Sequence, residues 1–275
     1  MKTKIMITVA PVARVANPNN DVDNPLTPPQ IARQTLACAK AGASQVHLHV
    51  RTEGGEMTSD TRVYSETLDL IRAQSNIVIQ GSTGGFEKSL TLDERCSAID
   101  DPRTDTASLN MGSINITFDT PFVNAGPEIE YWARRFKAQN VKPELEVFDT
   151  GQMAIIRDFM DRGLLESPLS INFPLGCYGG APASVESILA LRGLMPEGAE
   201  FGIAVNAMRD FRLIAASVAA GATKVRVGFE DSIFYAPGRK ARDNVVLVEK
   251  LAELVRALGC EIMSIDEARG HLGLD

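Results

Sequence analysis

The residues of this 275-residue chain that are best suited to chemistry are two histidines spaced two positions apart, in Gln45–Val50 (QVHLHV). His47 and His49 lie in an apolar run that is typical of a buried strand. Side chains at positions i and i+2 of a strand point to the same face, so the two imidazoles should lie close together. Such a pair suits a metal ion, which would relieve their mutual repulsion. The alternative is a pair of histidines whose hydrogen bonds satisfy them in a polar environment.

The elements that must position these residues are strands and helices, which are expected to alternate along the whole chain. Eight short apolar runs are expected to be strands: Lys4–Val9, Gln45–Val50, Asn76–Gln80, Thr106–Leu109, Lys142–Phe148, Ser167–Phe173, Glu200–Val205 and Thr223–Gly228. A helical pattern follows each run, and this alternation is typical of parallel strands with right-handed crossovers. Eight units predict a single (β/α)8 TIM barrel domain over residues 1–275. An open doubly wound sheet is the alternative, but no GxGxxG motif follows the first run.

Barrel topology supplies a candidate third ligand for the metal. Catalytic residues of such barrels lie at the carboxyl ends of the strands. In a closed barrel of eight strands, the second and the eighth strand both flank the first. Glu230, just past the eighth strand, can therefore reach His47 and His49. Two histidines and a glutamate with one open position form a catalytic zinc arrangement. The alternative for Glu230 is a solvated position in a loop.

Asp231 and Arg226 are candidates for acid–base chemistry beside that metal. Asp231 differs from Glu230 by one position, so its side chain should face the substrate or pair with Arg226. A carboxylate beside a metal-bound carbonyl is well placed to abstract a carbon-bound proton. The alternative for Arg226 is a structural ion pair across the barrel with Glu144 or Glu146.

The turn after the third strand could bind an anion. Ser82, Thr83, Gly84 and Gly85 offer hydroxyl groups and exposed backbone N–H groups, which can cradle an oxyanion or a carboxylate. An ordinary turn has the same composition. Asn110, at the end of the fourth strand, could orient polar substrate groups or hold a loop.

Composition excludes several functions. The formal net charge is −7, so the chain lacks the basic character of a nucleic-acid binder, and no apolar run approaches the length of a membrane span. The four cysteines are scattered without a CxxC motif, which favours free thiols in a reducing cytosol and a cytoplasmic protein. We interpret the first apolar run as a strand and not as a secretory signal.

Together these motifs resemble those of the β-keto acid cleavage enzyme family. The matching stretches follow one another over nearly the whole chain: Leu26–Pro28 (LTP), Ala41–Ala43 (AGA), His47–Arg51 (HLHVR), Ser82–Gly85 (STGG), Leu109–Gly112 (LNMG), Arg226–Asp231 (RVGFED) and Glu267–Arg269 (EAR). The specific parts are HLHVR and RVGFED at their relative spacing.

The resemblance implies a zinc-dependent (β/α)8 barrel that condenses a β-keto acid with acetyl-CoA. Acetoacetate and the CoA ester of the remaining fragment would be released. The resemblance also implies that His47, His49 and Glu230 hold the zinc ion, and that the protein is a homotetramer.

The resemblance further implies roles for the polar residues. Asp231, assisted by Arg226 and Ser82, would remove a proton from the carbon between the carbonyl and the carboxylate of the keto acid. Ser82, the residues that follow it, Ser108 and Asn110 would position that substrate.

Two positions depart from the family pattern. Members that act on an amino-substituted keto acid have a glutamate, resembling an ammonium receptor, where this chain has Arg14. Because arginine repels an ammonium and suits a carboxylate, we expect Arg14 to contact a keto acid whose distal end is anionic or neutral. Lys224 stands where the family often has a histidine, and it could touch substrate or face outward.

Two other functions compete with this interpretation. A zinc-dependent aldolase or hydrolase would also use a barrel with an HxH motif. Hydrolases of that type usually recruit further histidines, and only His271 remains, in the C-terminal tail, where we expect a surface position. The third possibility is a non-catalytic barrel that binds a metabolite.

Overall fold

The computed structural model describes residues 2–13, 21–84 and 90–274. Within these ranges, eight parallel strands close into a barrel in the order β1-β2-β5-β6-β9-β10-β11-β12, and β12 pairs with β1. Their bounds are β1 Lys4–Val9, β2 Gln45–Leu48, β5 Val78–Gly81, β6 Thr106–Asn110, β9 Lys142–Glu146, β10 Ser170–Leu175, β11 Glu200–Val205 and β12 Lys224–Val227. The (β/α)8 barrel that the sequence predicts is confirmed.

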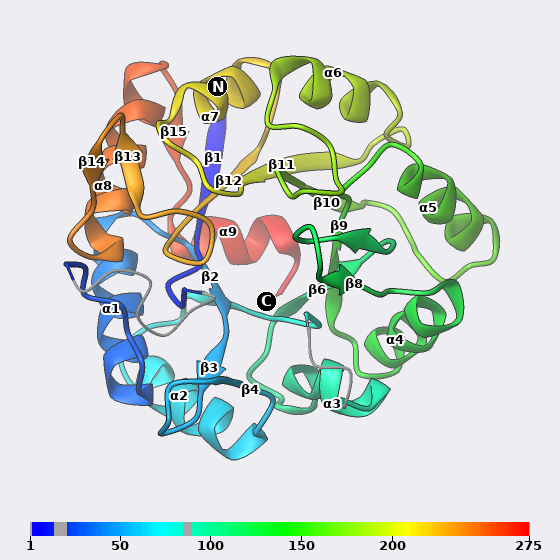
Figure 1. Ribbon diagram of the computed structural model, residues 1–275, viewed down its shortest axis with the longest axis horizontal. Helices are drawn as coiled ribbons and strands as arrows, with labels where there is room; N and C mark the ends of the chain where they lie inside the picture. Colours follow the sequence, from blue (N-terminus) through cyan, green and yellow to red (C-terminus); the bar gives the residue numbers. More distant parts are fainter. Residues whose placement is uncertain (1, 14–20, 85–89, 275) are drawn as a thin grey trace.

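Helices surround this barrel, as Figure 1 shows. They are α1 Pro28–Ala41, α2 Thr61–Arg72, α3 Leu92–Cys96 with a 3-10 turn at Ser97–Asp100, α4 Gly126–Ala138, α5 Gln152–Asp161, α6 Val185–Gly193, α7 Arg212–Ala219 and α8 Asn244–Ala257. The start of α1 illustrates how the sequence sets a boundary. The side chain of Gln30 accepts a hydrogen bond from the backbone N–H of Thr27 at 3.2 Å, which completes the cap. Gly42 ends the helix with a φ of 124°.

The inside of the barrel carries polar side chains that bond to one another. The hydroxyl of Thr8 donates to Oε1 of Gln45 at 2.7 Å, and Nε2 of Gln45 donates to the hydroxyl of Thr106 at 3.2 Å. These bonds offset the cost of removing polar groups from water. The outward faces of the same strands, such as Ile5 and Ile7 on β1, belong to the apolar core beneath the helices.

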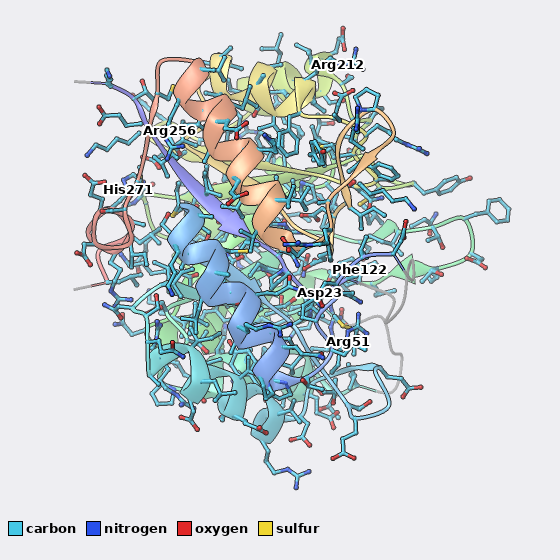
Figure 2. The ribbon with its side chains drawn as sticks, turned by 90° about the vertical axis from the view of Figure 1, so that its left-hand side faces the viewer. Asp23, Arg51, Phe122, Arg212, Arg256 and His271 are labelled. Carbon is cyan, nitrogen blue, oxygen red and sulfur yellow. The ribbon has the colours of Figure 1, made fainter. Side chains whose placement is uncertain are left out.

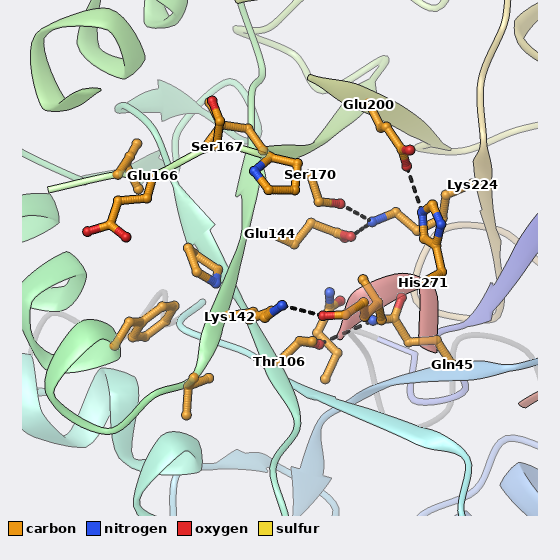
Figure 3. A pocket seen from close by; sticks show the side chains of 18 of the residues that line it. Gln45, Thr106, Lys142, Glu144, Glu166, Ser167, Ser170, Glu200, Lys224 and His271 are labelled. Carbon is orange, nitrogen blue, oxygen red and sulfur yellow. Dashed lines mark hydrogen bonds and ion pairs between the residues drawn. The ribbon is translucent and has the colours of Figure 1, made fainter. Parts of the chain in front are cut away.

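Lys224 neither touches the proposed metal site nor faces outward. It begins β12, so it lies at the amino-terminal end of the barrel, where it forms a buried ion pair with Glu144 and donates to Oγ of Ser170 at 2.9 Å. Figure 3 shows this pair in a cavity of about 380 Å³. Lys224 and Arg226 share the inner face of β12, but Lys224 lies one layer lower. The expectation that this side chain faces outward is therefore wrong.

The C-terminal segment adds β15 Glu261–Ile262, which pairs with β1, and α9 Ile265–Leu272. In Figure 1, which looks down the barrel, α9 lies across the centre of the ring. His271, on α9, is exposed as expected, and its Nε2 lies 2.8 Å from a carboxylate oxygen of Glu200. Figure 2 shows His271 at one end of the molecule and Arg51 and Phe122 at the other.

Short hairpins extend the loops that follow three of the barrel strands. They pair β3 Val50–Arg51 with β4 Met57–Thr58, β7 Ile114–Asn115 with β8 Pro121–Phe122, and β13 Phe234–Ala236 with β14 Arg239–Lys240. Because they follow β2, β6 and β12, they stand at the carboxyl ends of the strands. Among the described helices, none combines the length and the apolar character that a membrane crossing requires.

Candidate active site

Three side chains converge at the carboxyl end of the barrel as the sequence predicts. His47 lies in β2, His49 is the first residue after β2, and Glu230 comes after β12. Oε2 of Glu230 lies 3.6 Å from Nε2 of His47 and 3.7 Å from Nε2 of His49. One potential ligand atom from each of the three residues lies within 4.8 Å of the others. The two imidazoles therefore do share one face, with ring centroids 5.1 Å apart.

The chain reaches Glu230 through a turn that requires glycine. Gly228 has a φ of 148°, and a Cβ at this position would collide with the carbonyl oxygen of Ala10. That carbonyl instead accepts a hydrogen bond from the backbone N–H of Glu230 at 3.2 Å. The close approach of the turn to the end of β1 thus places the glutamate beside the histidines.

The electrostatic state of His47 suits a metal ligand. Burial lowers the pKa of its imidazole to about 3, so the ring is neutral at physiological pH. Its Nδ1 lies 2.7 Å from Oε1 of Gln80. Neutral imidazole nitrogens and a carboxylate oxygen are a donor set that divalent zinc accepts. The three residues therefore fit a divalent metal ion, on their chemistry and on their mutual distances.

Arg226 and Asp231 form a buried, two-pronged ion pair. Nε of Arg226 donates to Oδ2 of Asp231 at 2.8 Å, and Nη2 donates to Oδ1 at 2.6 Å. Nη2 also donates to Oε1 of Glu230 at 3.3 Å. The guanidinium therefore joins the candidate base to a candidate metal ligand. The alternative pairing of Arg226 with Glu144 is not what the structure shows, because Glu144 is the partner of Lys224.

Glu146 is a further site residue, which the sequence suggested only as a possible partner of Arg226. It lies on β9, is buried, and accepts a hydrogen bond from Nδ2 of Asn172 at 2.9 Å. Burial raises the pKa of its carboxyl to about 7. Glu146 can therefore hold or release a proton near neutral pH. Its two-residue spacing from Glu144 on a strand was the signal that both side chains face inward.

A pocket over these residues has a polar and an apolar side. Besides His47, His49, Glu146, Arg226 and Glu230, its lining consists of Met57, Ser82, Gly84, Ser108, Asn110, Ile116, Phe122, Phe148 and Pro174. The polar side comes from the turn after β5 and from the end of β6. The apolar side includes Ile116 and Phe122 of the loop that carries the β7–β8 hairpin. The pocket thus presents a polar wall and an apolar wall.

The turn after β5 is organised by its own side chains. Oγ of Ser82 accepts from the backbone N–H of Gly84 at 2.9 Å. Thr83 is fully buried, and its hydroxyl donates to the carbonyl of Ser108 at 2.7 Å and accepts from Nδ2 of Asn110 at 3.3 Å. Thr83 therefore ties the turn to β6, and a contact between Thr83 and substrate stays a prediction.

Two of the predicted substrate contacts belong to residues 14–20 and 85–89. Gly85 and Arg14 lie outside the described residues.

Comparison with known proteins agrees with these features. The family model described as beta-keto acid cleavage enzyme matches residues 4–274. The chain is 33% identical over 275 residues to the 3-keto-5-aminohexanoate cleavage enzyme of Fusobacterium nucleatum, covering 100% of this chain and 99% of that protein. It is 31% identical over 301 residues to the 3,5-dioxohexanoate:acetyl-CoA acetone transferase of Paraburkholderia graminis, covering 99% and 96%.

A solved structure supports the fold. The binary complex of ObcA with oxaloacetate superimposes with a TM-score of 0.79 at 19% identity, over 91% of this chain and 67% of that chain. At this identity the likeness concerns the fold alone. The match of the family model over almost the full length, together with full-length relatives above 30% identity, confirms the resemblance that HLHVR and RVGFED indicate. The chain belongs to the β-keto acid cleavage enzyme family.

Proposed function

We propose that this protein is a metal-dependent acyltransferase that condenses a β-keto acid with acetyl-CoA and releases acetoacetate and a new acyl-CoA. The observation that carries the proposal is the convergence of His47, His49 and Glu230 beside the Arg226–Asp231 pair, in a chain of this family. The name of the Paraburkholderia relative, an acetyl-CoA acetone transferase, supports acetyl-CoA as the second substrate.

Zinc is the metal that we propose for the site. Two imidazole nitrogens and one carboxylate oxygen leave an open position, which is the arrangement of catalytic zinc sites. When bound, the ion supplies a Lewis acid for the keto oxygen of the substrate. The chain's own contribution is to hold the three ligands and to place the base next to them.

In this proposal Asp231 removes the proton from the carbon between the keto group and the carboxylate of the substrate. Arg226 contacts both oxygens of Asp231 and orients the carboxylate. Ser82, Ser108 and Asn110 line the polar side of the pocket and are proposed to bind the substrate head. Gly84 and Gly85 would leave room for it, with Thr83 holding the turn.

The steps that follow form one carbon–carbon bond and break another, and they require no oxidant or reductant. The deprotonated carbon attacks the thioester carbonyl of acetyl-CoA and forms a new carbon–carbon bond. The CoA thiolate transfers to the original keto carbon, and the bond between that carbon and the deprotonated carbon breaks. The released carbanion takes a proton back from Asp231 and leaves as acetoacetate, which carries the acetyl group of acetyl-CoA, and the remaining fragment leaves as its CoA ester.

The distal end of the keto acid is proposed to be neutral or anionic. The apolar wall formed by Met57, Ile116, Phe122 and Phe148 supports a neutral group. Arg14 is proposed to accommodate an anionic group.

An aldolase or a hydrolase on the same metal site is the alternative function, and it would turn over substrate without acetyl-CoA. The homotetramer that the resemblance implies is part of our proposal.

Substituting a histidine tests the metal centre. We expect wild-type protein to bind about one zinc ion per chain and His49→Ala to lose most of its affinity, because two ligands hold the ion less tightly than three. Metal analysis after dialysis against buffered zinc measures both. His271→Ala is the control, because His271 pairs with Glu200 at the other end of the barrel. Equal zinc content in wild type and His49→Ala would contradict the assignment.

Replacing the candidate base tests the proton transfer. Asp231→Asn keeps the size of the side chain but removes the base, so kcat for acetoacetate formation should fall by about 10²–10⁴-fold. Asp101→Asn is a matched control, because Arg103 holds Asp101 through two bonds of 2.8 and 2.6 Å in the segment that precedes β6, at the amino-terminal end of the barrel. A normal kcat in zinc-loaded Asp231→Asn would remove Asp231 from the mechanism.

A series of β-keto acids that differ only at the distal end tests the specificity. We expect turnover of members with neutral or carboxylate ends and not of the amino-substituted member, since Arg14 would repel an ammonium. Initial rates of acetoacetate formation, measured by mass spectrometry, rank the series. Efficient turnover of the amino-substituted member would contradict the role of Arg14 and leave the reaction class intact.

A further inference from the structure

Gln80 is fully buried, and its side-chain amide contacts His47, a candidate metal ligand, at the ring nitrogen that does not face Glu230. It lies on β5 directly beside His47 of β2 in the strand register, and its Oε1 is 2.7 Å from Nδ1 of that histidine. Gln80 does not line the pocket over the metal ligands, but it lines the cavity at the amino-terminal end of the barrel. Its contact with the candidate site is therefore the one with His47.

The contact determines where the ring of His47 carries its proton. An amide oxygen can only accept a hydrogen bond, so Nδ1 has to donate. The lone pair of the neutral imidazole is then on Nε2, the atom that faces Glu230 at 3.6 Å. A metal ion needs this lone pair, and the opposite tautomer would direct an N–H group at the metal position.

The other half of the amide is also buried. Nε2 of Gln80 has no hydrogen-bond partner among the described side chains and backbone groups. If the amide were turned over, its nitrogen would donate to Nδ1 and the proton of His47 would move to Nε2. The orientation of one buried amide thus decides whether His47 can bind metal.

We propose that Gln80 is a positioning residue that selects the metal-binding tautomer of His47 and holds its ring, without touching metal or substrate. This inference rests on the proposed metal centre. Loss of such a hydrogen-bond partner typically weakens metal binding by about 10–100-fold.

The chain offers a matched control for this test. Gln45 is also a buried glutamine inside the barrel, but it bonds to Thr8 and Thr106 and not to a histidine. Figure 3 shows Gln45 and Thr106 in the amino-terminal cavity. Gln45→Leu and Gln80→Leu each remove one buried amide from the same interior, so a general loss of stability should affect both.

The experiment measures the zinc dissociation constant by competition with a chromophoric chelator. We expect Gln80→Leu to bind zinc about 10–100-fold more weakly than wild type. Gln80→Glu, which keeps an acceptor oxygen, should bind closer to wild type, and Gln45→Leu should match wild type. If Gln80→Leu does not fold, Gln80→Met takes its place. Wild-type affinity in Gln80→Leu, a Gln80→Glu variant as weak as Gln80→Leu, or an equal loss in Gln45→Leu would overturn the inference.

A second measurement reports the tautomer directly. The chain has three histidines, so ¹⁵N-labelled imidazoles can be assigned by substituting them one at a time. In metal-free wild-type protein, the ¹⁵N shifts of His47 should show the proton on Nδ1, and Gln80→Leu should lose this preference. A proton on Nε2 in the wild type would contradict the role of Gln80. Failure of the wild type to bind zinc would instead contradict the proposed function, so the two failures are distinguishable.

Discussion

The pairing of β1 with β2 on one side and with β12 on the other is the constraint on which the candidate site depends. His47 belongs to β2, whereas Glu230 follows β12, and they come from opposite parts of the chain. Only closure of the barrel through β1 brings them together. The turn at Gly228 then sets the position of Glu230, because it lets the chain pass close to the carbonyl of Ala10 and places Glu230 beside the histidines.

Charge balance gives a physical reason for a cation at this position. Among the described residues, three buried or nearly buried carboxylates, those of Glu146, Glu230 and Asp231, surround the guanidinium of Arg226. Burial of an excess of negative charge is unfavourable. The pKa of Glu146 is raised to about 7, chiefly because the carboxyl is removed from water and to a smaller extent because Glu230 and Asp231 are near. A divalent cation between His47, His49 and Glu230 would offset that excess. The buried Lys224–Glu144 pair, one layer below, is already balanced within the protein.

Much of the site could be predicted from the sequence because strand alternation and barrel closure are strong rules. The two-residue spacing of His47 and His49 determines that they share a face, and the order of the strands determines that Glu230 can reach them. The pairing of Arg226 with Asp231 was one of two orientations that we expected for that aspartate, and it is confirmed.

The features that the sequence did not predict depend on position within the barrel. Lys224 and Arg226 are two positions apart on β12, so the sequence pattern predicts the same inward direction for both side chains. They differ in height along the barrel: Arg226 lies near the metal-ligand candidates, and Lys224 lies in the cavity at the other end. No sequence motif includes Gln80. Its proposed role comes from His47, its neighbour on the adjacent strand. Helix α9 is short, and its position beneath the barrel follows from tertiary contacts.

Transfer of a label from acetyl-CoA tests the account most directly. Zinc-loaded protein would be incubated with a neutral β-keto acid and acetyl-CoA in which both acetyl carbons are ¹³C, and the products would be analysed by mass spectrometry. The account predicts acetoacetate that contains both labelled carbons, together with an unlabelled acyl-CoA formed from the keto acid. Label that remains in acetyl-CoA or appears only in acetate, while the keto acid is consumed, would contradict it.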